Sequence, residues 1–136
     1  MIHRLHQWFS RFFQPGSTGA RGEQLACDHL ASQGYAILSR NLRAGRGEID
    51  ILARSPDGKC LVVVEVKTSA KRHQMFAPEL RVNARKRQKL QTTAMQVIRR
   101  FNLQNLPMRF DVIAVELPEG QSPVIRHIPG AFESRY

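Results

Sequence analysis

The chain has 136 residues and 42% apolar side chains, which is enough for one domain with a hydrophobic core, and we expect no second domain. Its formal net charge of +10 at pH 7 favours an anionic partner, nucleic acid or a charged surface, over a neutral one. The two cysteines lack metal-ligand spacing and the five histidines are scattered, so we expect free thiols in a reducing compartment and no zinc site.

Residues 1–13 carry apolar side chains at helical spacing, among them Leu5, Trp8, Phe9 and Phe12. We expect a short amphipathic helix that packs on the domain, with contact to a membrane surface as the less favoured alternative. The segment has no long apolar run and no small-residue cleavage site. This predicts a cytoplasmic protein with no transmembrane segment and no secretory signal. Residues 1–17 as a whole are interpreted as an extension and linker.

A helix is predicted from about Thr18 to Gln33, ended by Gly34, and a first strand over residues 35–41. Glu23 lies on the same stripe of the helix as its apolar residues, which are Ala26, Cys27, Leu30 and Ala31. From spacing alone, Glu23 either reaches solvent at the edge of this stripe or needs a partner inside the fold.

Two strands joined by a turn form the centre of the prediction. Residues 60–67 are apolar as far as Val64, which is typical of a strand covered on both faces. Residues 48–53 alternate, which places Ile49, Ile51 and Ala53 on one face. Residues 55–58 have turn chemistry, so we expect antiparallel pairing that brings Asp50 alongside Glu65. Lys67 points the same way as Glu65, about 6.7 Å further along its strand.

Two carboxylates about 4 Å apart repel by roughly 4 kcal/mol at an effective dielectric of about 20, so a positive group must offset them. A buried salt bridge to Lys67 is one solution. The other is a divalent cation, Mg²⁺ or Mn²⁺, since Mg²⁺ takes one or two carboxylates together with waters and a phosphate. With Lys67 facing the phosphate, the second solution predicts phosphodiester hydrolysis. Glu48 shares the face of Asp50 and is either a further ligand or a partner for Arg46.

Basic residues gather in three segments beside these strands: a loop over residues 42–46, a loop over residues 68–78, and the start of a helix over residues 84–101 that Asn83 caps. They are Arg43, Arg46, Lys71, Arg72, Arg85 and Lys86. We interpret them as contacts to nucleic-acid phosphates, because guanidinium and ammonium groups match phosphate oxygens. An ordinary solvated basic surface is the alternative.

The remaining chain completes the sheet. Residues 108–115 predict a buried strand, parallel to the strand over residues 60–67 because a helix lies between them. Asp111 within it is better explained as a partner for Arg109, or for a lysine of a neighbouring strand, than as a site residue. Residues 124–128 predict an edge strand and residues 129–136 a loose tail, so the domain is expected over residues 18–128.

The motifs resemble known ones. Asp50 followed by Glu65-Val66-Lys67 resembles the PD-(D/E)xK nuclease signature, except that Ile49 stands where the signature has proline. Between about Thr18 and Val115 the chain resembles the YraN-like family of small bacterial proteins, which is similar to Holliday-junction resolvases. The matching words are Gly22-Glu23, Gly34-Tyr35, Arg40-Asn41, Gly47-Glu48-Ile49-Asp50, Val64-Glu65-Val66-Lys67-Thr68 and Arg109-Phe110-Asp111-Val112.

The resemblance implies an α/β, restriction-endonuclease-like fold, with a mixed central sheet of four or five strands flanked by helices. It implies that Asp50, Glu65 and Glu23 bind the metal, that Lys67 acts with Asp50 and Glu65 in catalysis, and that Lys86 matches a recurring lysine. The expected function is a metal-dependent endonuclease acting on nucleic acid, with DNA favoured over RNA and branched DNA as a candidate substrate. Two-fold junctions would suit a homodimer. The alternative is a nucleic-acid-binding protein that keeps the fold without cutting.

Overall fold

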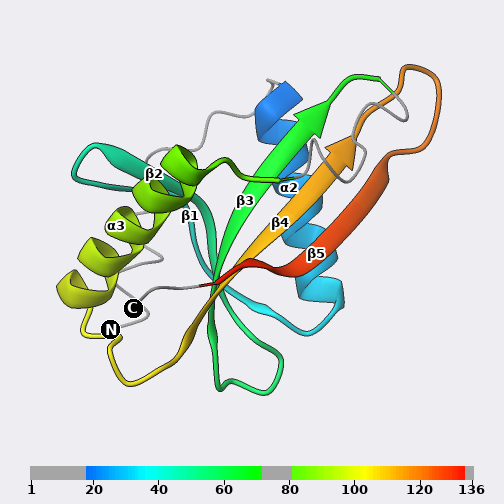
Figure 1. Cartoon of the computed structure of the whole chain (residues 1–136). Helices are drawn as coiled ribbons and strands as arrows, with labels where there is room; N and C mark the ends of the chain where they lie inside the picture. Colours follow the sequence, from blue (N-terminus) through cyan, green and yellow to red (C-terminus); the bar gives the residue numbers. More distant parts are fainter. Residues whose placement is uncertain (1–17, 72–80, 134–136) are drawn as a thin grey trace.

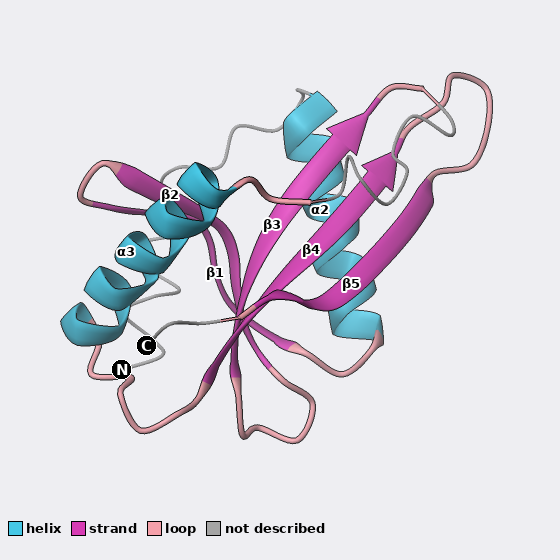
Figure 2. Cartoon of the chain, in the orientation of Figure 1, coloured by secondary structure: helices cyan, strands magenta, loops and turns pink. Residues whose placement is uncertain are grey.

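The computed structural model describes residues 18–71 and 81–133. Five strands form one mixed sheet in the order β1-β2-β3-β4-β5, with helix α2 on one face and helix α3 on the other (Figure 1, Figure 2). This confirms the predicted α/β fold with a mixed sheet flanked by helices. The helix predicted over residues 1–13, the linker to residue 17 and Arg72 lie outside the described residues.

The elements follow the predicted order, with some different ends. They are α2 (Thr18–Ser32), β1 (Ala36–Ala44), β2 (Gly47–Arg54), β3 (Leu61–Ser69), α3 (Ala84–Arg100), β4 (Met108–Glu116) and β5 (Val124–Phe132). The loop predicted over residues 42–46 is wrong, because β1 continues to Ala44 and leaves only Gly45 and Arg46 as the turn into β2. Gly45 has φ +58°, a conformation that favours glycine and permits so tight a turn. The loose tail from residue 129 is also wrong, since β5 runs on to Phe132.

Strand β3 lies in the middle of the sheet and β5 at one edge, as predicted. Strand β3 pairs antiparallel with β2 and parallel with β4. The parallel register is unbroken from Leu61 opposite Met108 to Ser69 opposite Glu116. The remaining pairs, β1 with β2 and β4 with β5, are antiparallel. Helix α3 connects β3 to β4 and begins at the predicted cap, where the Asn83 side chain accepts a hydrogen bond from Lys86 N at 2.9 Å. The β3–β4 pair is therefore the continuous part of the sheet on which the site is built.

The sheet is covered on both faces, and each face has its own apolar core. Under α3 the buried residues include Leu52, Val63, Leu90 and Phe110. Under α2 they include Leu30, Val62, Val64 and Ile113. The alternation of β3 is as predicted, with Val62 and Val64 on the α2 side and Leu61 and Val63 on the α3 side.

Strand β2 does not alternate as predicted. Ile49 packs with Leu52 on the α3 side, whereas Ile51 and Ala53 pack on the α2 side. The prediction that Ile49 shares a face with Ile51 is therefore wrong. The regular pleat of β2 is interrupted at the residue between them, Asp50.

Two glycines let the helices approach the sheet closely. A Cβ atom at Gly22 of α2 would overlap the side chain of Thr68 on β3, and one at Gly47 of β2 would overlap the side chain of Thr93 on α3. Both positions need a residue without a side chain because the interiors of proteins are closely packed. The contacts fix each helix against the part of the sheet that carries the candidate site.

Candidate active site

Backbone pairing between β2 and β3 ends just before Asp50. The paired residues run from Arg54 opposite Leu61 to Ile51 opposite Val64. Beyond them, Val66 N donates a hydrogen bond of 2.8 Å to Asp50 Oδ2. A side chain therefore takes the place of a backbone carbonyl, and the β1–β2 hairpin swings away from β3 beneath α3 (Figure 1). The sheet opens at this point.

Asp50 and Glu65 meet at the opening. Their carboxyl groups are hydrogen-bonded to each other, and Glu65 is buried with 6% of its surface exposed. Burial, together with the negative charge of Glu65, raises the pKa of Asp50 to about 8. With a pKa of about 8, Asp50 is mostly protonated at neutral pH and can donate a hydrogen bond to Glu65. The predicted convergence of these two acids is confirmed.

The cation that contacts Glu65 comes from α3. The Nζ atom of Lys86 forms an ion pair with Glu65 Oε1, and this hydrogen bond raises the pKa of Lys86. Lys67 Nζ donates a hydrogen bond of 2.9 Å to the backbone oxygen of Arg81, just before the cap of α3. Burial and the nearby charge of Lys86 lower the pKa of Lys67. Both lysines therefore lie beside Glu65, and they approach it from different elements.

Glu23 approaches the acidic pair from α2. Its side chain is hydrogen-bonded to Asn41 of β1, burial raises its pKa, and its charge interacts with those of Arg40, Glu48 and Glu65. Asn41 has φ +49° and lies across from Asp50, between the pairs Arg40–Ile51 and Leu42–Ile49. Glu23 therefore has a partner inside the fold and does not simply face solvent. The alternation of the first strand predicted no role for Asn41, and its only signal in the sequence is the Arg40-Asn41 segment of the family resemblance.

Within residues 18–71 and 81–133, no three His, Cys, Asp or Glu side chains are gathered as a ready metal centre. Glu23 thus does not join Asp50 and Glu65 in a preassembled set of three ligands. The Asp50–Glu65 pair by itself fits a hard cation, because two carboxyl groups already in contact would give up a proton in exchange for it and Mg²⁺ needs only one or two carboxylates. Binding of Mg²⁺ or Mn²⁺ stays a prediction.

The acidic pair opens into a cavity between α3 and the sheet, with a volume of about 230 Å³. It is lined by Glu48, Asp50, Glu65, Lys86, Lys89, Leu90 and Thr93. Lys89 and Thr93 were absent from the predicted site. Helical spacing could have found them, since Lys89 follows Lys86 by three residues and Thr93 follows it by seven, which places all three on the same side of α3.

The predicted phosphate-binding residues do not form one cluster but lie at several separate sites. Arg43 lies 3.9 Å from Glu48 in an exposed pair, so the acid considered as a partner of Arg46 pairs with Arg43 instead. Arg46 and Arg85 line a second, larger cleft beside α3. Lys71 is exposed just past the end of β3. Of the predicted residues that the structure describes, Lys86 is the one that reaches the carboxylate pair.

Residues 22–115 match the model of the uncharacterised protein family UPF0102. The chain belongs to this family. A UPF0102 protein of Trichlorobacter lovleyi is 44% identical over 121 residues, covering 88% of this chain and 93% of the relative. A UPF0102 protein of Porphyromonas gingivalis is 43% identical over 115 residues, covering 84% of this chain and 82% of the relative. Family membership confirms the resemblance drawn from the motifs.

Among solved structures, the chain is similar to Pyrococcus furiosus SfsA in complex with Ca²⁺, with a TM-score of 0.33 and 15% identity. The likeness covers 82% of this UPF0102 chain and 62% of SfsA. It is too weak to carry an argument. None of the helices described in residues 18–71 and 81–133 is long and apolar enough to cross a membrane.

Asp111 is a second buried acid in the segments that resemble the family, and it belongs to a separate hydrogen-bond network. Arg109 donates two hydrogen bonds to its carboxylate at 2.8 and 2.9 Å, and Gly130 N donates one at 3.0 Å. His127 Nε2 lies 2.7 Å from Oδ2, and Arg109 also donates to the Tyr35 hydroxyl at 2.8 Å. The prediction that Asp111 pairs with Arg109 is confirmed. The network joins Tyr35, just before β1, to β4 and β5, and it explains why β5 extends past its predicted end.

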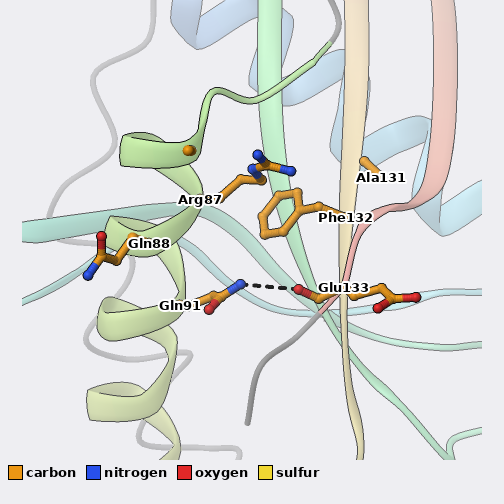
Figure 3. A pocket seen from close by; sticks show the side chains of 7 residues that line it. Arg87, Gln88, Gln91, Ala131, Phe132 and Glu133 are labelled. Carbon is orange, nitrogen blue, oxygen red and sulfur yellow. Dashed lines mark hydrogen bonds between the residues drawn. The ribbon is translucent and has the colours of Figure 1, made fainter.

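A third hollow lies on the other side of α3, between the helix and the end of β5 (Figure 3). It has a volume of about 460 Å³ and is lined by Ala84, Arg87, Gln88, Gln91, Ala131, Phe132 and Glu133. Gln91 closes its floor by donating a hydrogen bond of 3.1 Å to the backbone oxygen of Glu133 (Figure 3). Helix α3 therefore has a hollow along each flank, and only the one toward β1 and β2 adjoins the acidic pair.

Proposed function

We propose that this UPF0102 protein is a metal-dependent endonuclease that hydrolyses phosphodiester bonds in nucleic acid, with DNA favoured over RNA. One observation carries the proposal: buried Glu65 and half-buried Asp50 lie in contact at an opening of the sheet, with Lys86 and Lys67 beside them. Their desolvation and mutual repulsion oppose folding. A protein that only binds nucleic acid gains nothing from such a pair, whereas a nuclease needs it to hold a cation.

Asp50 and Glu65 would hold Mg²⁺ or Mn²⁺, and Glu23 is a further acid whose charge reaches the pair. When bound, the cation supplies positive charge that polarises a phosphoryl oxygen and makes a bound water more acidic. Oxygen ligands from carboxylates suit these cations better than softer metals. The proton now shared by Asp50 and Glu65 leaves as the ion binds.

The lysines of the chain would act on the phosphate and on the attacking water. Lys67 is held by its hydrogen bond to the Arg81 backbone, while burial and the nearby charge of Lys86 lower its pKa. Lys67 orients the water and stabilises negative charge as it develops on the phosphate. Hydrolysis forms a bond from the water oxygen to phosphorus and breaks the bond from phosphorus to the leaving sugar oxygen. That oxygen then takes up a proton.

Lys86 would contribute its charge from the mouth of the same cavity. Half of its side chain is exposed, although its Nζ atom pairs with buried Glu65. The side chain therefore extends from solvent to the acidic pair, along the path that an incoming phosphate would take. An ammonium group here lowers the cost of bringing a phosphate close to two acids.

Branched DNA is the proposed substrate class within DNA, and a homodimer the proposed assembly, both on the family's similarity to junction resolvases. These two points rest on analogy of fold. They are separable from the proposed chemistry, because a single acidic pair and its lysines suffice to cut one strand.

The experiment is a panel of labelled single-stranded, duplex, nicked and branched DNA, with matching RNA, in Mg²⁺ or Mn²⁺. The chain is expected to cut at least one substrate. Asp50→Ala and Glu65→Ala should abolish cutting while the substrate still binds. If the unmodified chain binds these nucleic acids and cuts none of them with either metal, the proposal fails and the non-catalytic alternative takes its place.

A further inference from the structure

The cleft between α3 and the β1–β2 turn is basic. It has a volume of about 570 Å³, and the charged side chains that line it are Arg46, Arg85 and Lys89. The other described residues of its wall are small or carry uncharged polar side chains, including Gln88, Thr92 and Gln96. Three cations with no acid on the same wall attract an anion, and amide and hydroxyl groups can donate hydrogen bonds to its oxygens.

This cleft adjoins the cavity of the acidic pair. Lys89 and Thr93 line both, so the two spaces are neighbours along one side of α3. Arg46 and Arg85 lie on the wall of the cleft and not on that of the cavity, whereas Glu65 and Lys86 line only the cavity. A nucleic-acid strand that lies along this side of α3 would pass both spaces.

Two glycines allow the close contact between the β1–β2 turn and α3. A Cβ atom at Gly45 would come within 2.6 Å of Gln96 Oε1, and one at Gly47 would overlap Thr93. The β1–β2 turn can lie this close to α3 only because both residues lack side chains. The same closeness brings Arg46 of the turn to the same cleft as Arg85 and Lys89 of the helix.

We propose that this cleft binds the phosphate next to the scissile one, so that a nucleic-acid strand leaves the acidic pair toward the β1–β2 turn. The assignment of the scissile phosphate to Asp50 and Glu65 rests on the proposed function. Arg46 and Arg85 present guanidinium forks that match phosphate oxygens, and Lys89 lies at the boundary between the two phosphates.

The hollow on the opposite flank of α3 is the competing route, and its chemistry disfavours a phosphate. Its charged lining residues are one cation, Arg87, and one acid, Glu133 (Figure 3). The hydrogen bond from Gln91 to the Glu133 backbone already uses part of its polar lining. The strand therefore runs along one flank of the helix.

The first test measures binding of a labelled single-stranded DNA to the full chain over a range of salt concentrations, in Ca²⁺. The double variant Arg85→Ala/Lys89→Ala is compared with Arg87→Ala/Arg99→Ala, which removes two exposed charges from the same helix. We expect the first variant to lower the slope of log affinity against log salt by about 0.7, the value for one single-strand phosphate contact. The control should retain most of the slope. An equal or larger loss in the control overturns the proposal.

The second test locates the phosphate. The linkages on either side of the cleaved one are replaced singly by neutral methylphosphonates. We expect one replacement to weaken binding to the unmodified chain and to have no effect on Arg85→Ala/Lys89→Ala. If that replacement weakens binding to both proteins equally, the cleft does not hold the neighbouring phosphate. If nothing is cut, the proposed hydrolysis fails, and the salt slopes alone decide whether the cleft binds phosphate.

Discussion

The carboxyl groups of Asp50 on β2 and Glu65 on β3 are hydrogen-bonded to each other where the backbone pairing of their strands ends. Asp50 also accepts a hydrogen bond from Val66 N, so one side chain both replaces a link in the sheet and forms half of the acidic pair. Burial and the negative charge of Glu65 raise the pKa of Asp50 to about 8, so Asp50 holds its proton strongly. The proton on Asp50 would compete with a cation for binding to the acidic pair.

The raised pKa of Asp50 makes stability depend on pH. Its folded-state pKa of about 8 exceeds the ordinary value of 3.8, so the stabilisation is fully present below 3.8 and is lost as the pH rises through about 8. Asp50→Asn keeps a hydrogen-bonding group of the same shape and cannot ionise. The variant should lose this decline and become more stable than the unmodified chain at pH 9. Urea unfolding from pH 5 to 9 measures it.

The matched control for that experiment is Asp28→Asn, at an exposed aspartate of α2. It should leave the pH profile of the unmodified chain unchanged. Parallel profiles for Asp50→Asn and the unmodified chain would show that Asp50 has an ordinary pKa.

Divalent cations should stabilise the fold more at high pH than at low pH. Below the pKa of Asp50 the cation must displace a proton, and above it the site is already ionised. At a concentration of one hundred times its Kd, the cation adds about 2.7 kcal/mol to the free energy of unfolding. Thermal unfolding with and without Mg²⁺ at pH 6 and pH 9 checks this. Glu65→Gln should abolish the effect, and an equal shift in that variant would place the cation elsewhere.

Lys67 should affect the rate of cutting and not the affinity for substrate. Lys67→Ala removes an amine that would stabilise charge in the transition state, and such losses slow reactions by about 10²- to 10³-fold. Single-turnover cleavage together with a binding titration separates the two effects. Lys59→Ala, at an exposed lysine of the β2–β3 turn, is the control. A rate unchanged by Lys67→Ala would remove Lys67 from the catalytic set.

Asp111 should matter for stability and not for chemistry. Asp111→Ala leaves Arg109 and His127 without their shared acceptor and should cost about 3–5 kcal/mol. Burial alone would raise the pKa of Asp111, but hydrogen bonds from His127, Arg109 and Gly130 hold it below its usual value. Its stabilisation is therefore present above 3.8 and is lost as the pH falls through the lowered value. Acid unfolding measures the loss, with Asp28→Ala as the control.

Local patterns in the sequence were sufficient for much of the fold. The apolar run before Glu65 predicted a central strand, and Asn83 marked the start of α3, because burial on two faces and helix capping depend on a few neighbouring residues. The convergence of Asp50 and Glu65 followed from the turn between their strands, which fixed the antiparallel pairing.

The face of Ile49 and the partner of Glu65 could not be predicted in this way. Ile49 changes sides because the Asp50 side chain, and not the backbone of β2, bonds to Val66 N. Lys86 reaches Glu65 because Gly47 and Thr93 pack α3 closely against β2. Both depend on contacts between residues distant in sequence, on which alternation and spacing give no information.

The most direct measurement is cleavage of one substrate from the panel by the unmodified chain and by Glu65→Gln, in Mg²⁺ and at equal fractions of bound substrate. Glu65→Gln retains the size of the side chain and removes its ability to ionise. We predict cutting by the unmodified chain that EDTA stops, and a loss of at least about 10³-fold in Glu65→Gln. Cutting at the same rate by both proteins would contradict a cation held by Asp50 and Glu65.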